Sequence, residues 1–150
     1  MTELAVPATS LVVLVGVSGS GKSTFAREKF GAWETLSSDA FRGLVSNDEN
    51  SQSATGDAFD ALRHVAGIRL RNGLLTVIDA TNVQPAARKS MVALAKEHDV
   101  LPVAIVLDVP ERVAVERTEA RDDRGFGAEV IHRQATQLRR GLSSLRREGF

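Results

Sequence analysis

The 150-residue sequence contains no cysteine, which rules out disulfide bonds, a thiolate nucleophile and thiolate zinc ligands. It has no excess charge of either sign, because 19 Lys and Arg residues balance 19 Asp and Glu residues. A protein that coats nucleic acid usually carries a basic excess, so any contact with nucleic acid is expected to be local. No apolar run is long enough to span a membrane, and no Lys or Arg precedes the first apolar residues as a secretory signal requires. The sequence therefore predicts a soluble, cytoplasmic protein.

Short apolar runs alternate with helix-periodic stretches, the pattern of an α/β fold. The length is that of one domain, and we expect it to occupy residues 1–150. Strands are predicted at 11–15, 34–37, 74–79 and 103–107. Helices are predicted at 23–30, at 39–45, around 59–70, and from Pro85 and Pro110 onward. A last helix carries one stripe of Ile131, Gln134, Leu138, Leu142 and Leu145, and residues 46–54 are predicted to be a polar, disorder-prone loop.

Residues Gly16 to Ser23 read GVSGSGKS and match the GxxxxGK[ST] pattern between a predicted buried strand and a helix. Glycines let successive N–H groups point at phosphate oxygens, and the start of the helix adds its positive dipole end. We therefore predict that ATP or another NTP binds here, with Lys22 on the β and γ phosphates and Ser23 on Mg²⁺. The alternative is a glycine-rich turn without a ligand. The predicted binding residues of this stretch are Gly16, Ser18, Gly19, Ser20, Gly21, Lys22, Ser23 and Thr24.

Asp79 ends the strong apolar strand at 74–79 and is predicted to be the second Mg²⁺ group, directly or through water. The other interpretation is an ordinary strand-end Asp that forms a turn with Thr81 and Asn82. Both interpretations can hold at once.

The segment Ser37 to Arg42, SSDAFR, follows a predicted strand and should open on the same sheet edge as the phosphate loop. Asp39 and Arg42 are three residues apart and would share one helix face. Asp39 could take the proton from an attacking hydroxyl, and Arg42 could orient the acceptor or a phosphate on it. Equally open is a structural interpretation, with Asp39 as a helix N-cap and Arg42 as a solvated side chain.

Arg117, Arg121 and Arg124 are spaced four and three residues apart and would form one positive stripe on a helix. Arginines bind phosphate oxygens in a forked geometry, so these three are predicted to form a lid over the nucleotide, with Arg121 catalytic. Gly125 and Gly127 would let that lid move. The alternative is a solvated helix whose arginines pair with nearby carboxylates, namely Glu116, Glu119, Asp122 and Asp123.

Together these features predict a three-layer P-loop kinase fold, with about four mostly parallel strands, helices on both faces and an arginine-rich lid. The motifs GVSGSGKSTFA, SSDAFRGLVSNDEN, TGDAFD, LTVIDATNV, ARK and LRREGF, from about Leu11 to Phe150, resemble the kinase module of bacterial polynucleotide kinase-phosphatase. That family transfers the γ-phosphate of an NTP to the 5′-hydroxyl end of broken RNA or DNA. In it the kinase is usually the first module of a longer protein with phosphatase and ligase-like modules, so we expect an excised domain or a stand-alone relative.

The resemblance implies a role for each predicted site residue. Lys22 and Ser23 would bind the NTP and its Mg²⁺, Asp39 would be the general base, and Arg42 would hold the acceptor's phosphate. The lid would consist of Arg117, Arg121 and Arg124. Two other functions stay open on the residues alone: a small-molecule kinase acting on a sugar, polyol or antibiotic hydroxyl, and a binding module that ATP merely toggles.

Overall fold

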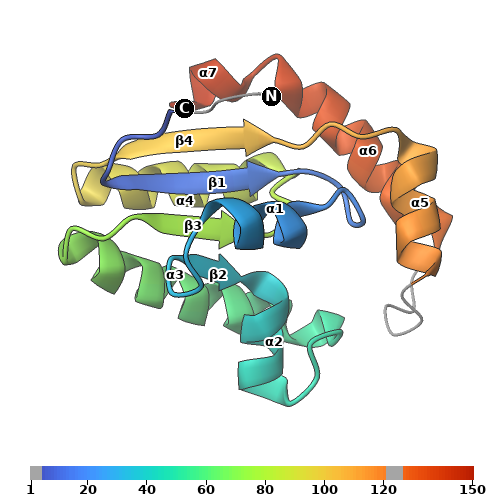
Figure 1. The fold of residues 1–150 in the computed structure, drawn as a ribbon, viewed down its shortest axis with the longest axis horizontal. Helices are drawn as coiled ribbons and strands as arrows, with labels where there is room; N and C mark the ends of the chain where they lie inside the picture. The colour runs from blue at the N-terminus through green and yellow to red at the C-terminus, as the bar shows by residue number, and fades with distance from the viewer. Residues whose placement is uncertain (1–4, 121–126) are drawn as a thin grey trace.

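The computed structural model describes residues 5–120 and 127–150, and its strands form one parallel sheet in the order β2-β3-β1-β4 (Figure 1). Because all four strands run in the same direction, their carboxyl ends open on one edge. This confirms the predicted α/β class and the predicted sheet of about four strands. The strands are β1 (Ser10–Val15), β2 (Thr35–Ser37), β3 (Thr76–Asp79) and β4 (Leu101–Val106).

Helices cover both faces of this sheet, and Figure 1 shows α1 and α4 on opposite sides of it. Side chains alternate along β1, so Leu11 and Val13 join the larger core cluster while Val12 and Leu14 join the smaller one, with Ala26 of α1. β1 is buried along its whole length, which explains why its sequence is a continuous apolar run. The helices are α1 (Lys22–Lys29), α2 (Ser38–Ser46), α3 (Thr55–Arg71), α4 (Pro85–Glu97), α5 (Glu111–Glu119), α6 (Ala128–Leu142) and α7 (Leu145–Glu148), with a 3₁₀ turn, η1 (Gln52–Ala54).

The register of β2 against β3 decides where the polar residues after these strands lie. Ser37 is paired with Asp79, so the last residue of β2 lies beside the last residue of β3. Asp39 follows two residues after Ser37, at the start of α2. The chain therefore brings the Asp39 segment and Asp79 to the same sheet edge.

Two sequence predictions about irregular regions were wrong. The last helix does not run through Leu145, because α6 ends at Leu142 and Leu145 begins the separate helix α7. The Ser144 hydroxyl donates to the Gly141 carbonyl oxygen at 3.0 Å, and such local side-chain bonds compete with helix continuation. The loop at 46–54 is not irregular throughout, since it contains η1 and is held by Arg42, whose Nε donates to the Glu49 carbonyl at 2.9 Å.

The helix α7 is attached to α4 by an ion pair between the buried Arg88 and the partly buried Glu148. Arg88 is 1% exposed, and its Nε and Nη2 donate to the two carboxylate oxygens of Glu148 at 2.6 and 2.9 Å. Its Nη1 donates to the carbonyl oxygens of Asn82 and Val83, at 3.1 and 2.9 Å. The hydrogen bond from Arg88 lowers the pKa of Glu148, against the opposing effect of burial.

Among the described helices, none is long and apolar enough to cross a membrane.

Candidate active site

One cleft of about 460 Å³ lies at the carboxyl edge of the sheet, within the size range of small-molecule sites. It brings together residues that the sequence placed in three separate motifs: the phosphate loop, the start of α2 and the end of β3. Of the predicted site residues, those that line it are Ser18, Gly19, Gly21, Lys22, Ser23, Thr24, Asp39, Arg42 and Asp79.

The phosphate loop runs from the end of β1 to the start of α1 and needs glycine at specific positions. Gly19 and Gly21 have φ angles of 81° and 95°, in the left-handed region that glycine adopts at little cost. A Cβ on Gly19 would also lie 2.3 Å from the carbonyl oxygen of Ala114 in α5. Gly16, at the start of the loop, donates its N–H to the Thr81 carbonyl at 2.9 Å. The loop is thus fixed between β3 and α5.

Lys22 lies at the first position of α1 and is 9% exposed. Its Nζ donates to the Val17 carbonyl oxygen at 2.9 Å, so the ammonium group folds back over the phosphate loop. Ser20, within the loop, is buried, and its hydroxyl has no hydrogen-bond partner among residues 5–120 and 127–150. The predicted phosphate-binding lysine is therefore held inside the cradle rather than in solvent.

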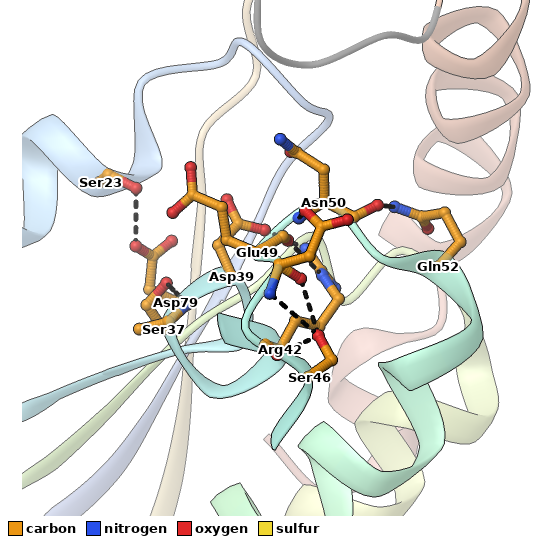
Figure 2. A network of polar contacts seen from close by, with 11 residues as sticks. Ser23, Ser37, Asp39, Arg42, Ser46, Glu49, Asn50, Gln52 and Asp79 are labelled. Atoms are coloured by element: carbon orange, nitrogen blue, oxygen red, sulfur yellow. Dashed lines mark hydrogen bonds and ion pairs between the residues drawn. The ribbon is translucent and has the colours of Figure 1, made fainter. Parts of the chain in front are cut away.

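Ser23 and Asp79 face each other across the cleft floor, as Figure 2 shows. The Ser23 hydroxyl donates to Asp79 Oδ2 at 2.8 Å. A hydroxyl and a carboxylate oxygen at this separation are the hard oxygen donors that Mg²⁺ prefers. No hydrogen bond from Thr81 or Asn82 to the Asp79 carboxylate occurs in the described part of the chain; Asn82 Nδ2 donates to the Leu14 carbonyl at 2.8 Å instead. The contact brings the two predicted Mg²⁺ groups together, and their metal role stays a prediction.

Asp39 and Arg42 form an ion pair on the first turns of α2, between Arg42 Nη2 and Asp39 Oδ1 (Figure 2). Both structural alternatives for these residues were wrong. The N-cap of α2 is Ser37, whose hydroxyl accepts from the Ala40 N–H at 3.3 Å, so Asp39 is not the cap. Arg42 is not solvated: it is 9% exposed and bonds Asp39 and the Glu49 carbonyl. Both side chains are oriented by the fold into the cleft lining.

The predicted lid is described only at Arg117, because Arg121 and Arg124 lie outside the described residues. Arg117 comes from α5, and its Nη1 donates to the Gly19 carbonyl at 3.3 Å. Among the described residues it makes no ion pair with Glu116 or Glu119. Arg117 therefore contacts the phosphate loop but does not line the cleft, and its role in a lid stays a prediction.

Sequence reasoning missed a contact between α6 and the phosphate loop. Oε1 of Gln134 accepts a hydrogen bond from the Ser18 N–H at 2.8 Å, across 116 residues of chain. The sequence prediction assigned Gln134 to the apolar stripe of the last helix, whereas its side chain lines the cleft. A polar glutamine in an otherwise apolar stripe was the available signal, but it could not identify the partner.

The comparisons with known proteins agree with this geometry. A family model described as an AAA domain matches residues 11–145, almost the whole chain. The chain belongs to this AAA-domain family. Membership and fold make it a P-loop kinase domain that binds nucleotide. A comparison with curated protein sequences found no match.

Among solved structures, the chain is similar to one in the Pnkp1/Rnl/Hen1 RNA repair complex, with a TM-score of 0.77 and 27% identity. The match covers 93% of this chain and 47% of the other. This chain therefore spans about half the length of that relative. Pnkp1 is a polynucleotide kinase-phosphatase, which confirms the resemblance read from the motifs.

Two small-molecule kinases share the fold. A gluconokinase from Sinorhizobium meliloti 1021 has a TM-score of 0.58 and 19% identity, over 93% of this chain and 80% of the other. The APS kinase CysC from Mycobacterium tuberculosis, in complex with AMPPNP and APS, has a TM-score of 0.57 and 24% identity, over 80% and 72%. At these identities the likeness shows the fold alone.

Proposed function

We propose that this P-loop kinase domain transfers the γ-phosphate of ATP or another NTP to the 5′-hydroxyl end of RNA or DNA, as a step of end repair. The observation that carries the proposal is the shared cleft, in which the Asp39–Arg42 pair lies with Lys22 and the Ser23–Asp79 pair. A general base, an acceptor-binding cation and a phosphate cradle in one cleft are the parts that phosphoryl transfer to an alcohol needs.

In the proposed reaction the phosphate loop holds the triphosphate with its backbone N–H groups, and Lys22 neutralises charge on the β and γ phosphates. The oxygen of the 5′-hydroxyl forms a bond to the γ-phosphorus while Asp39 accepts the hydroxyl's proton. At the same time the bond between the γ-phosphorus and the bridging β-phosphate oxygen breaks, and the nucleoside diphosphate leaves. Arg42 donates from Nε to the Glu49 carbonyl and from Nη2 to Asp39, and its Nη1, which bonds no described residue, would bind the acceptor's phosphate. These residues position the hydroxyl and the phosphorus in line.

Ser23 and Asp79 would hold Mg²⁺ at the cleft floor, through the oxygens that now share a hydrogen bond. When bound, the ion would neutralise charge on the β and γ phosphates. Arg121 and Arg124, with Arg117, are proposed to cover the nucleotide. Phosphatase and ligase-like modules in the same protein or complex are proposed partners, by analogy with the RNA repair complex.

The test is a transfer assay with γ-labelled ATP, Mg²⁺ and an oligonucleotide that ends in a 5′-hydroxyl. We expect label on the 5′ end and none on a matched oligonucleotide that already carries a 5′-phosphate. Parallel reactions contain gluconate, glycerol and an aminoglycoside as competing alcohols. Label on one of these alone would replace the proposal with a small-molecule kinase, and nucleotide binding without any transfer would indicate a binding module.

A further inference from the structure

The helix α6 forms one wall of the cleft. Its face toward the cleft is mostly polar, whereas its face toward the core is apolar. Three of its buried residues, Ile131, Ala135 and Leu138, belong to the core cluster. A separate set at spacings of three, one and three residues faces the cleft, and helical periodicity puts these four on one face. They are Val130, Arg133, Gln134 and Gln137.

Arg133 differs from the other cations of this cleft. Among residues 5–120 and 127–150, the cationic residues in its lining are Lys22, Arg42 and Arg133. Lys22 is directed to the Val17 carbonyl, and Arg42 is engaged by Asp39 and the Glu49 carbonyl. Arg133 makes no hydrogen bond or ion pair with any residue in 5–120 or 127–150. Its exposed guanidinium is a positive charge that no described residue engages, at the wall of a site that is proposed to bind polyanions.

The neighbouring residue fixes where this charge lies. Gln134 is bonded to the Ser18 N–H at 2.8 Å, so α6 is attached to the first half of the phosphate loop. The second half of the loop, at Lys22 and Ser23, begins α1 and bears the metal pair. Arg133, the neighbour of Gln134 on α6, therefore lines the same cleft as the first half of the loop and as Arg42.

Two glutamine amides, of Gln134 and Gln137, accompany Arg133 on this wall, and it contains no carboxylate. Neutral amides both donate and accept hydrogen bonds, which suits the sugar and base of a nucleotide. A single guanidinium can fork onto the two free oxygens of one phosphodiester. With a single cation, the wall fits one additional phosphate of a nucleic-acid strand. It does not carry the several cations that would be needed to bind a long run of phosphates.

We propose that Arg133 binds a second phosphate of the acceptor strand, the phosphodiester beyond the one assigned to Arg42. The inference rests on the proposed function and narrows its substrate: the preferred acceptor is an oligonucleotide with at least two phosphates rather than a mononucleotide. The competing role for Arg133 is contact with the NTP itself, which the experiment below separates.

The experiment compares two 5′-hydroxyl acceptors at saturating ATP: a nucleoside 3′-monophosphate, with one phosphate, and a dinucleotide 3′-monophosphate, with two. Arg133→Gln should raise the KM for the dinucleotide about tenfold, as for the loss of one charge-assisted hydrogen-bonded contact. The KM for the mononucleotide and the KM for ATP should stay at their wild-type values. The dependence of log KM on log salt should become shallower by about one phosphate contact for the dinucleotide.

The matched control is Arg139→Gln, which removes the same charge from the same helix. Arg139 is exposed, lies outside the cleft lining and bonds only Thr136 at 3.4 Å among the described residues, so its variant should behave as wild type. An equal KM increase for both acceptors, a raised KM for ATP, or no change at all in Arg133→Gln would overturn the inference. Failure of the proposed function is visible separately, because the wild-type protein would then label neither acceptor.

Discussion

Two arginine–carboxylate pairs in this molecule contrast in geometry and location. Arg42 and Asp39 are three residues apart on α2 and line the cleft, whereas Arg88 and Glu148 are 60 residues apart and join α4 to α7. Both arginines are nearly buried, at 9% and 1% exposure. Arg88 bonds both oxygens of its carboxylate and two carbonyl groups, while Arg42 bonds one oxygen and one carbonyl.

The difference separates a pair suited to chemistry from a pair suited to stability. A carboxylate bonded through both oxygens to a buried guanidinium joins two helices and is fixed in place. The Asp39–Arg42 pair is local, and both of its side chains line the cleft where a ligand can reach them. We therefore expect a change in the first pair to alter turnover and a change in the second to alter the free energy of unfolding.

The largest expected effect is that of Asp39→Asn on turnover. Asn keeps an oxygen that can accept from Arg42 but cannot take the acceptor's proton, so kcat should fall about a thousandfold. That loss corresponds to about 4 kcal/mol in the activation barrier. The measurement is the initial rate of transfer at saturating NTP, with nucleotide binding and the melting temperature of the same variant as controls. Turnover near the wild-type value would refute the assignment of Asp39 as base.

Glu148→Ala should have the next largest effect, and it should appear in stability. Removing the carboxylate leaves the buried Arg88 charge unpaired, which costs about 3 kcal/mol in the free energy of unfolding. For a chain of this size that is a fall in Tm of roughly 6–12 °C. Thermal unfolding followed by circular dichroism measures it.

The matched variant is Glu119→Ala, at the exposed end of α5, which should change the unfolding free energy by less than about 0.5 kcal/mol. Equal melting temperatures for the two variants would mean that the α4–α7 pair contributes no stability. The claim that the Arg88–Glu148 pair acts on stability, in contrast to the Asp39–Arg42 pair, would then be wrong.

A smaller effect is expected from acid. Because Arg88 holds the pKa of Glu148 below its ordinary value of 4.5, the folded state binds the proton of this group less readily than the unfolded state. Its contribution to stability is fully present above pH 4.5 and is lost as the pH falls through the lowered pKa of the folded state. Urea unfolding between pH 6 and pH 3 should show a steeper loss for the wild type than for Glu148→Gln. Parallel slopes would contradict the pairing.

The sequence predicted the local parts of this structure well. The glycine-rich pattern of residues 16–23 identifies the phosphate loop because its spacing is a local property, and the apolar runs identify the strands. It could not identify the bond between Gln134 and Ser18 or the pair between Arg88 and Glu148, because those partners meet only after the chain folds. The choice between Asp39 as cap and Asp39 as cleft residue depended on a two-residue difference in where α2 begins, and the cap at Ser37 decides it.

The central position of β1 has a kinetic consequence for the phosphate loop that follows it. Every residue of β1 is buried, and the strand is bonded to β3 on one side and β4 on the other. Segments with this much buried backbone exchange their amide hydrogens only when the whole domain opens. The phosphate loop follows directly on β1, the strand whose amides are expected to exchange most slowly. Transient opening of peripheral elements therefore leaves the start of the loop in place.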